Sequence, residues 1–142
     1  MYRHKYVEGE KHDINELKEI VHDLRDPKYG CSWDTAQTHE TMKKCLMDEC
    51  EEVIAAVDNN DDQNLCEELG DVLLQILLNT EIAQERGAFT FDDVIQVLSD
   101  KLIRRHPHVF GDEPRPENEE DALALWRKVK AIEKARKAQS NQ

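Results

Sequence analysis

The sequence predicts an all-α fold, a bundle of four to five helices. Proline and glycine are scarce, at four and five residues of 142, and no stretch alternates apolar and polar residues convincingly. Apolar residues recur instead at helical spacing, in segments separated by polar turns. A chain of this length can bury one ordinary core. We therefore expect one helical domain over residues 13–137, after a loose arm at 1–12 and before a polar tail at 138–142.

The overall charge excludes some partners. The formal net charge is −12 at pH 7, which repels a nucleic-acid duplex or an anionic membrane. The longest apolar run, residues 72–78, is interrupted by Gln75 and is too short to span a bilayer. No signal peptide is visible, and the four cysteines form no Cys-x-x-Cys pair. We expect a soluble cytoplasmic protein with reduced thiols.

The first helix is expected to begin after Asp13, whose side chain can cap it. Its apolar face consists of Ile14, Leu17, Ile20, Val21 and Leu24. Pro27 ends the helix, because the residue before a proline disfavours helical geometry. Residues 28–37 are predicted to form a loop that contains Trp33 and Asp34. Trp33 either covers the core or offers a flat surface to a ligand ring, and the position over the core is favoured.

The second helix carries the first group of acidic residues. It is predicted to begin at Thr38 or Thr41 and to run to about Asp58. The polar residues 59–63 then form a turn. Because this turn is short, the next helix is expected to lie antiparallel beside the second.

The third helix is predicted over about residues 64–86, with Gly87 as a left-handed C-terminal cap. Its middle, residues 72–78, is apolar on nearly every side, as in a helix that is buried all round. A small domain cannot cover such a helix completely with its own neighbours. We therefore expect a second copy of the chain to cover the remaining face.

The last part of the chain is predicted to hold two more helices. Thr90 and Asp93 give a capping-box-like start to the fourth helix, and Pro107 ends it. Its inward side chains are expected to be Val94, Ile95, Leu98 and Leu102. Residues 112–118 are predicted to be a flexible linker, and a final amphipathic helix spans about residues 119–137.

Two pairs of carboxylates lie on the long helices. Glu49 and Glu52 stand three apart, as do Glu68 and Asp71, so each pair projects from one helix face. Both pairs border apolar stripes, and packing the helices together gathers four carboxylates into one patch. Such like charges repel one another and are costly to desolvate, so a bound divalent cation is the simplest remedy. Oxygen ligands of this kind suit Mg²⁺ or Mn²⁺. The alternative is a solvated acidic surface.

Basic and aromatic side chains mark a second candidate site. Lys101 and Arg105 stand four apart on one face of the fourth helix and could bind phosphate oxygens. Cations in a last helical turn also interact favourably with the helix dipole, so a purely structural role is the alternative. Trp126 lies on the apolar side of the final helix, where it can pack against the core.

Several sequence blocks together resemble one known family. They are Leu24-Arg-Asp-Pro27, Cys31-Ser-Trp33-Asp34 with Gln37-Thr38, the two acidic pairs, Lys101-Leu-Ile-Arg-Arg-His-Pro-His-Val-Phe-Gly111 and Trp126-Arg-Lys-Val-Lys130. In this order and at these distances, the blocks resemble those of MazG-type nucleoside triphosphate pyrophosphohydrolases over roughly residues 13–135. Three positions depart from the family pattern without removing any of the four acids: Ser32, Asp48 and Asn79.

The resemblance implies an all-α NTP pyrophosphatase fold whose four-helix arrangement is completed by dimerisation. It also implies Mg²⁺-dependent cleavage of a nucleoside triphosphate to the monophosphate and pyrophosphate. Carried over by position, the metal-binding and catalytic acids are Glu49, Glu52, Glu68 and Asp71. The positions that contact the nucleotide are Lys101, Arg105 and Trp126, with Trp33 and Asp34 from the loop before the acidic helix.

Three functions remain open at this point. The first is broad housecleaning hydrolysis of NTPs and dNTPs, since stacking on a tryptophan tolerates any base. The second is a narrower dUTP- or dCTP-preferring pyrophosphatase of the same fold. The third is a non-catalytic dimer that binds nucleotide or metal. In all three, a homodimer is the expected assembly and a tetramer the alternative.

Overall fold

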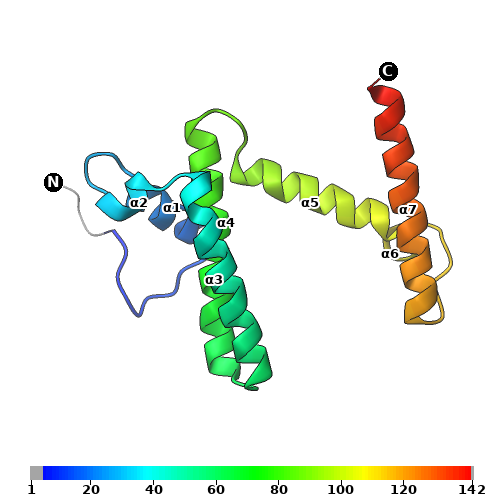
Figure 1. The fold of residues 1–142 in the computed structure, drawn as a ribbon, viewed down its shortest axis with the longest axis horizontal. Helices are drawn as coiled ribbons and strands as arrows, with labels where there is room; N and C mark the ends of the chain where they lie inside the picture. Colours follow the sequence, from blue (N-terminus) through cyan, green and yellow to red (C-terminus); the bar gives the residue numbers. More distant parts are fainter. Residues whose placement is uncertain (1–4, 142) are drawn as a thin grey trace. The chain divides into compact units, whose positions relative to one another are not determined.

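The computed structural model of this chain describes residues 5–141, and this range contains seven helices and no strand (Figure 1). The predicted all-α fold class is therefore confirmed. The helices belong to two compact units, one ending at Phe91 and the other beginning at Asp92. Residues 1–4 of the predicted arm and Gln142 of the predicted tail lie outside the described residues. None of the helices described is long and apolar enough to cross a membrane.

In the first unit, α1 (Ile14–Leu24) begins as predicted, because the Asp13 side chain accepts a hydrogen bond from the amide of Glu16 at 2.9 Å. The prediction that residues 28–37 form only a loop is wrong. The structure has a short helix there, α2 (Ser32–Ala36). This segment has no apolar periodicity to indicate a helix. Its C-terminal end is held by a side chain from α1, described below.

The helices α3 (His39–Asp58) and α4 (Asp62–Glu85) form an antiparallel hairpin, shown side by side in Figure 1. Thr38 and Thr41 form a reciprocal capping box at the start of α3, as their sequence positions suggest. At the end of α4, Gly87 has φ +72° and takes the left-handed conformation that the sequence predicts. These two caps set where the hairpin that carries the acidic residues begins and ends.

The hydrophobic core of the first unit forms where α1 and α3 pack against the second half of α4. Its buried members are Val21, Met42, Leu77, Leu78 and Ile82. As predicted, the chain's own neighbours do not cover residues 72–78 of α4 on every side, since Ile76 is 42% exposed. One side of α4 faces α1 and α3, and the other lies open.

The second unit contains α5 (Phe91–Arg105), the short α6 (Pro107–Phe110) and α7 (Glu119–Ser140). Pro107 ends α5 as predicted and also begins α6, where its missing N–H costs nothing. The final helix, α7, is capped by Asn118 and extends three residues beyond the predicted end at Lys137.

The expectation that one face of α5 points inward is not met within this chain. Ile95, Leu98 and Leu102 are 45–47% exposed, and no residue of α5 is buried. Within the second unit, α7 meets α5 near its C-terminal turn, through Glu133. Within the second unit, α7 therefore does not cover the apolar side of α5 farther from that turn.

Replacing Gly30 by alanine is expected to destabilise the turn between α1 and α2 by about 1–3 kcal/mol. A Cβ at this position would lie 2.4 Å from the carbonyl oxygen of Leu24 and 2.6 Å from that of Asp26. Both contacts are with backbone, which cannot move aside cheaply. Urea unfolding measures the effect. Gly70→Ala is the control, because its Cβ meets no atom within 4 Å, and it should be neutral or stabilising.

Candidate metal centre and phosphate-binding residues

The hairpin of α3 and α4 brings acidic side chains together across the two helices. Glu49 of α3 and Glu68 and Asp71 of α4 each offer a carboxylate oxygen, and these oxygens lie within 4.8 Å of one another. Glu49 and Glu68 are half-buried, and Asp71 is exposed. Glu52, one turn after Glu49, is exposed and lies outside this group of three.

The electrostatics of the cluster are unfavourable in the protein alone. The pKa of Glu68 is raised, first by its partial burial and then by the negative charges of Glu52, Asp71 and Glu49. Among residues 5–141, none of these four acids has an ion pair with a basic side chain. Crowded oxygen ligands without a counter-charge fit the chemistry of a hard divalent cation such as Mg²⁺ or Mn²⁺.

In the second unit, Arg105 and Trp126 lie together, although their helices are separated by a loop. The guanidinium carbon of Arg105 lies 5.8 Å from the centre of the Trp126 ring, and the ammonium of Lys130 lies 4.4 Å from it. Lys101 is half-buried on α5 and has no carboxylate partner in the part of the chain described. A cavity of about 270 Å³ borders this group and is lined by Arg105, His106, His108, Glu119, Ala122, Leu123 and Trp126.

Arg105 is bound by a carboxylate on α7. Its Nη2 donates to Oε2 of Glu133 at 3.0 Å, and its Nε donates to the same oxygen at 3.2 Å. Arg104 shares the carboxylate, with its Nε at 2.5 Å from Oε1. Hydrogen bonds from Arg105 and then Arg104 lower the pKa of Glu133 to about 2. Glu133 is therefore ionised at any physiological pH.

The remaining two candidate residues lie in α2. The interpretation of Trp33 as a lid over the core is wrong in this chain, because its side chain is 53% exposed. Asp34 is half-buried, and its backbone carbonyl is held by Arg25. The other interpretation of Trp33, as a flat surface for a ligand ring, stays a prediction.

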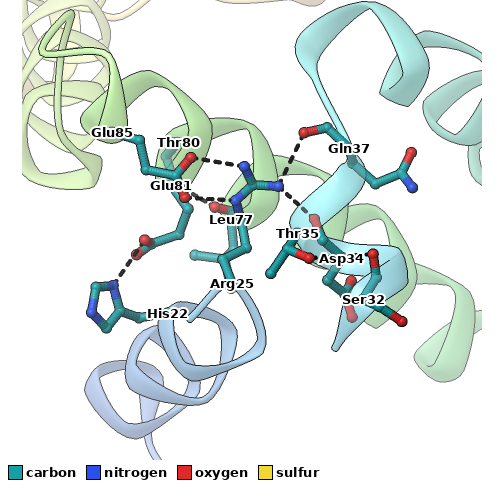
Figure 2. Close-up of polar contacts among 10 residues, drawn as sticks. All are labelled: His22, Arg25, Ser32, Asp34, Thr35, Gln37, Leu77, Thr80, Glu81 and Glu85. Atoms are coloured by element: carbon teal, nitrogen blue, oxygen red, sulfur yellow. Dashed lines mark hydrogen bonds and ion pairs between the residues drawn. The ribbon is translucent and has the colours of Figure 1, made fainter. Parts of the chain in front are cut away.

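Arg25 connects three elements of the first unit, as Figure 2 shows. Its Nε and Nη2 each donate to one oxygen of Glu85 on α4, both at 2.7 Å. Its Nη1 donates to the carbonyl of Asp34 at 2.5 Å and to that of Gln37 at 3.1 Å. The Arg25 side chain is only 8% exposed, whereas the Glu85 side chain is 45% exposed, so the guanidinium is shielded from water and its carboxylate partner is only partly so. It fixes α2 against the C-terminal half of α4.

Sequence reasoning did not assign Arg25 a structural role. Two pairs of residues in the sequence have the helical spacing that these contacts need. His22 in the last turn of α1 and its C-cap residue Arg25 stand three apart, and Glu81 and Glu85 stand four apart on α4. Figure 2 shows both pairs in contact, with Nδ1 of His22 at 3.0 Å from a carboxylate oxygen of Glu81.

A protein with this helical fold and with acids on two antiparallel helices can be compared with known families, and the chain matches the MazG nucleotide pyrophosphohydrolase domain family. This family matches residues 37–110, more than half of the chain. The chain belongs to this family, and the resemblance read from its motifs is confirmed.

Two curated relatives and one solved structure show how similar the chain is to known members. It is 51% identical over 127 residues to the nucleoside triphosphate pyrophosphohydrolase/pyrophosphatase MazG of Thermotoga maritima, covering 89% of this chain and 48% of that protein. It is 44% identical over 126 residues to the nucleoside triphosphate pyrophosphohydrolase of Escherichia coli K12, with coverage of 89% and 48%. The chain thus spans about half the length of these relatives.

The solved structure is that of a mazG-related protein from Thermotoga maritima. It has a TM-score of 0.68 and 34% sequence identity, and the match covers 83% of this chain and 99% of that one. The likeness in fold therefore extends over most of this chain.

Proposed function

We propose that this chain hydrolyses nucleoside triphosphates, NTPs and dNTPs alike, to the monophosphate and pyrophosphate in a Mg²⁺-dependent reaction. The observation that carries the proposal is the group of carboxylate oxygens from Glu49, Glu68 and Asp71 within 4.8 Å of one another, with no basic partner among the described residues. Membership of the MazG family supports it, because relatives at 44% and 51% identity are named for this activity.

In this proposal, Glu49, Glu68 and Asp71 hold the cation and Glu52 acts beside them. When bound, Mg²⁺, or Mn²⁺ in its place, neutralises charge on the triphosphate and on the leaving pyrophosphate. Glu52 is exposed and close enough to raise the pKa of Glu68, so we assign it to orient a water and accept its proton. The water oxygen attacks the α-phosphorus, the bond from that phosphorus to the bridging oxygen breaks, and pyrophosphate leaves.

The basic and aromatic residues are assigned to substrate binding. Lys101 and Arg105 hold the distal phosphates of the nucleotide. These two basic residues come either from the same chain as the acids or from a partner subunit. Either Trp126 or Trp33 stacks on the nucleotide base, and Asp34 is assigned to the site as the neighbour of Trp33. Stacking is tolerant of base identity. This arrangement supports a broad housecleaning role.

Assembly as a homodimer is part of the proposal. Exposed apolar side chains on α5 in the second unit, and separately Ile76 on α4 in the first unit, are each surface that a second copy could bury. A mass measured by light scattering tests this, with a tetramer as the alternative and a mass equal to one chain as the contrary result. Residence in the cytoplasm and the absence of nucleic-acid and membrane partners stay predictions.

The activity is tested with each NTP and dNTP in the presence of Mg²⁺ or Mn²⁺, measuring pyrophosphate release. A chelator serves as the control for metal dependence. Pyrophosphate release from most nucleotides supports the proposal. Pyrophosphate release from dUTP or dCTP alone indicates the pyrophosphatase with narrower substrate specificity. Binding of nucleotide without any release indicates the non-catalytic module and contradicts the proposed hydrolysis.

A further inference from the structure

Glu133 of α7 lies between two arginines at the end of α5. Its side chain is 13% exposed, compared with 19% for Arg105 and 45% for Arg104. The contact with Arg105 uses both Nε and Nη2, so one edge of the planar guanidinium is held by the carboxylate. Arg104 contributes Nε alone and is more exposed to water. The Arg105 contact is therefore the more tightly constrained of the two.

The other edge of Arg105 remains available. Its Nη1 makes no hydrogen bond with any residue in the range 5–141. A guanidinium carries five N–H donors in a fixed plane, so holding one edge also sets the direction of the rest. The same side chain borders the cavity of about 270 Å³ that Trp126 and His106 help to line.

We propose that Glu133 is a positioning residue: it holds one edge of Arg105 so that Nη1 is presented to a phosphate oxygen of a nucleotide bound beside Trp126. This inference rests on the assignment of Arg105 to phosphate binding in the proposed function. It adds that the orientation of Arg105, and not only its charge, determines nucleotide affinity.

The surrounding charges favour positioning over competition with the ligand. One carboxylate faces two guanidiniums here, and Lys130, Lys134 and Lys137 border the adjoining hollow. The group therefore keeps a positive excess that attracts phosphate. If Glu133 were neutral, Arg104 and Arg105 would repel each other without a shared partner, and Arg105 would lose its fixed plane.

The test compares Glu133→Gln and Glu133→Asp with the wild type. Glutamine keeps the size and removes the charge, whereas aspartate keeps the charge and shortens the reach. Calorimetry then measures binding of an α,β-methylene nucleoside triphosphate and of tripolyphosphate, each with Mg²⁺. Both variants are expected to bind each ligand about tenfold more weakly, the effect typical of losing a group that orients a ligand-binding side chain. Glu120→Gln, an exposed acid on the same helix, is the matched control and should bind as the wild type does.

A double-mutant cycle with Arg105→Lys isolates the positioning effect. A lysine has no fork to be held, so adding Glu133→Gln in that background should change affinity little. Circular dichroism should show the same helix content for every variant. The inference is overturned if Glu133→Gln binds as tightly as the wild type or more tightly. It is also overturned if Glu133→Gln weakens binding equally with Arg105 and with Lys at that position, or if Arg105→Lys alone leaves binding unchanged.

These outcomes are distinct from failure of the proposed hydrolysis. Wild-type protein that binds the nucleotide but releases no pyrophosphate contradicts the hydrolysis, and the coupling between Glu133 and Arg105 is still measured by binding. Wild-type protein that hydrolyses nucleotides while the Glu133 variants bind normally contradicts the positioning role alone.

Discussion

Replacing Glu68 by glutamine is expected to lower Mg²⁺-dependent pyrophosphate release by about a thousandfold or more, because metal coordination supplies several kcal/mol of transition-state stabilisation. Glu68 lies in the group of three acids, and its partial burial and then the charges of Glu52, Asp71 and Glu49 raise its pKa. The measurement is the steady-state rate of pyrophosphate release at saturating Mg²⁺. Asp71→Asn should have an effect of the same order.

Glu67→Gln is the matched control for this loss. It removes the same charge from the neighbouring, exposed position on α4, which is not part of the cluster. Its rate should stay near that of the wild type, and all variants should keep their helical circular dichroism. If Glu68→Gln turned over nucleotide at the wild-type rate, the metal assignment would be contradicted.

The raised pKa of Glu68 predicts that both the stability of the fold and its affinity for Mg²⁺ depend on pH. Partial burial comes first among the causes, followed by the charges of Glu52, Asp71 and Glu49. A carboxyl whose folded pKa is raised stabilises the fold when protonated, and this contribution is lost as pH rises through that pKa. At neutral pH without metal, Glu68→Gln should therefore melt at a slightly higher temperature than the wild type. Mg²⁺ affinity of the wild type should decline as pH falls through the raised pKa.

Replacing Arg25 by alanine is expected to destabilise the first unit by about 2–4 kcal/mol, since hydrogen bonds to a charged group are each worth about 1.5–3 kcal/mol before solvent screening. The change removes the fork to Glu85 and leaves the carbonyls of Asp34 and Gln37 without their donor. Urea unfolding followed by circular dichroism measures the loss. Arg25→Lys should recover only part of it, because an ammonium cannot span all the partners. Full stability in Arg25→Ala would show that the network contributes nothing.

The pH dependence of the Arg25 network has the opposite sign to that of Glu68. The hydrogen bond from Arg25 lowers the pKa of Glu85 below its ordinary value of 4.5. The pair therefore contributes stability above pH 4.5 that is lost as pH falls through the lowered folded pKa. The difference in unfolding free energy between wild type and Glu85→Gln should shrink over that window. A constant difference down to the lowest pH at which the protein folds would contradict this account.

The helix ends were predictable where a local side chain or a glycine determines them. Asp13, Thr38 and Gly87 act within a few residues of their own position, so the sequence alone indicates their effect. The helix α2 was missed because its support comes from outside its own segment, through Arg25 at the C-terminal cap of α1. Ile95 was expected to point inward but is exposed. An apolar stripe on a helix indicates that this face is to be buried, but it does not indicate whether the same chain or a second copy buries it.

The acidic centre was predictable in outline because helical spacing places its pairs. The i, i+3 pattern put Glu68 and Asp71 on one face, and the short turn implied an antiparallel neighbour carrying Glu49. For Arg105, the sequence predicted the basic character of its surroundings but not its carboxylate partner. Its basic character follows from the sequence, but the partner Glu133 lies 28 residues away, and no spacing rule connects positions on two different helices.

The acids of the centre belong to both arms of the α3–α4 hairpin, so a cation held there would join the two helices as a reversible cross-link. Any opening of the hairpin would have to break contacts with Glu49 on one side or with Glu68 and Asp71 on the other. A ligand that binds the closed form alone lowers the population of the open form, and the effect grows with the ratio of free ligand to its Kd. Amide hydrogen exchange in α3 and α4 should therefore slow together when Mg²⁺ is added, while exchange in α7 serves as the internal reference.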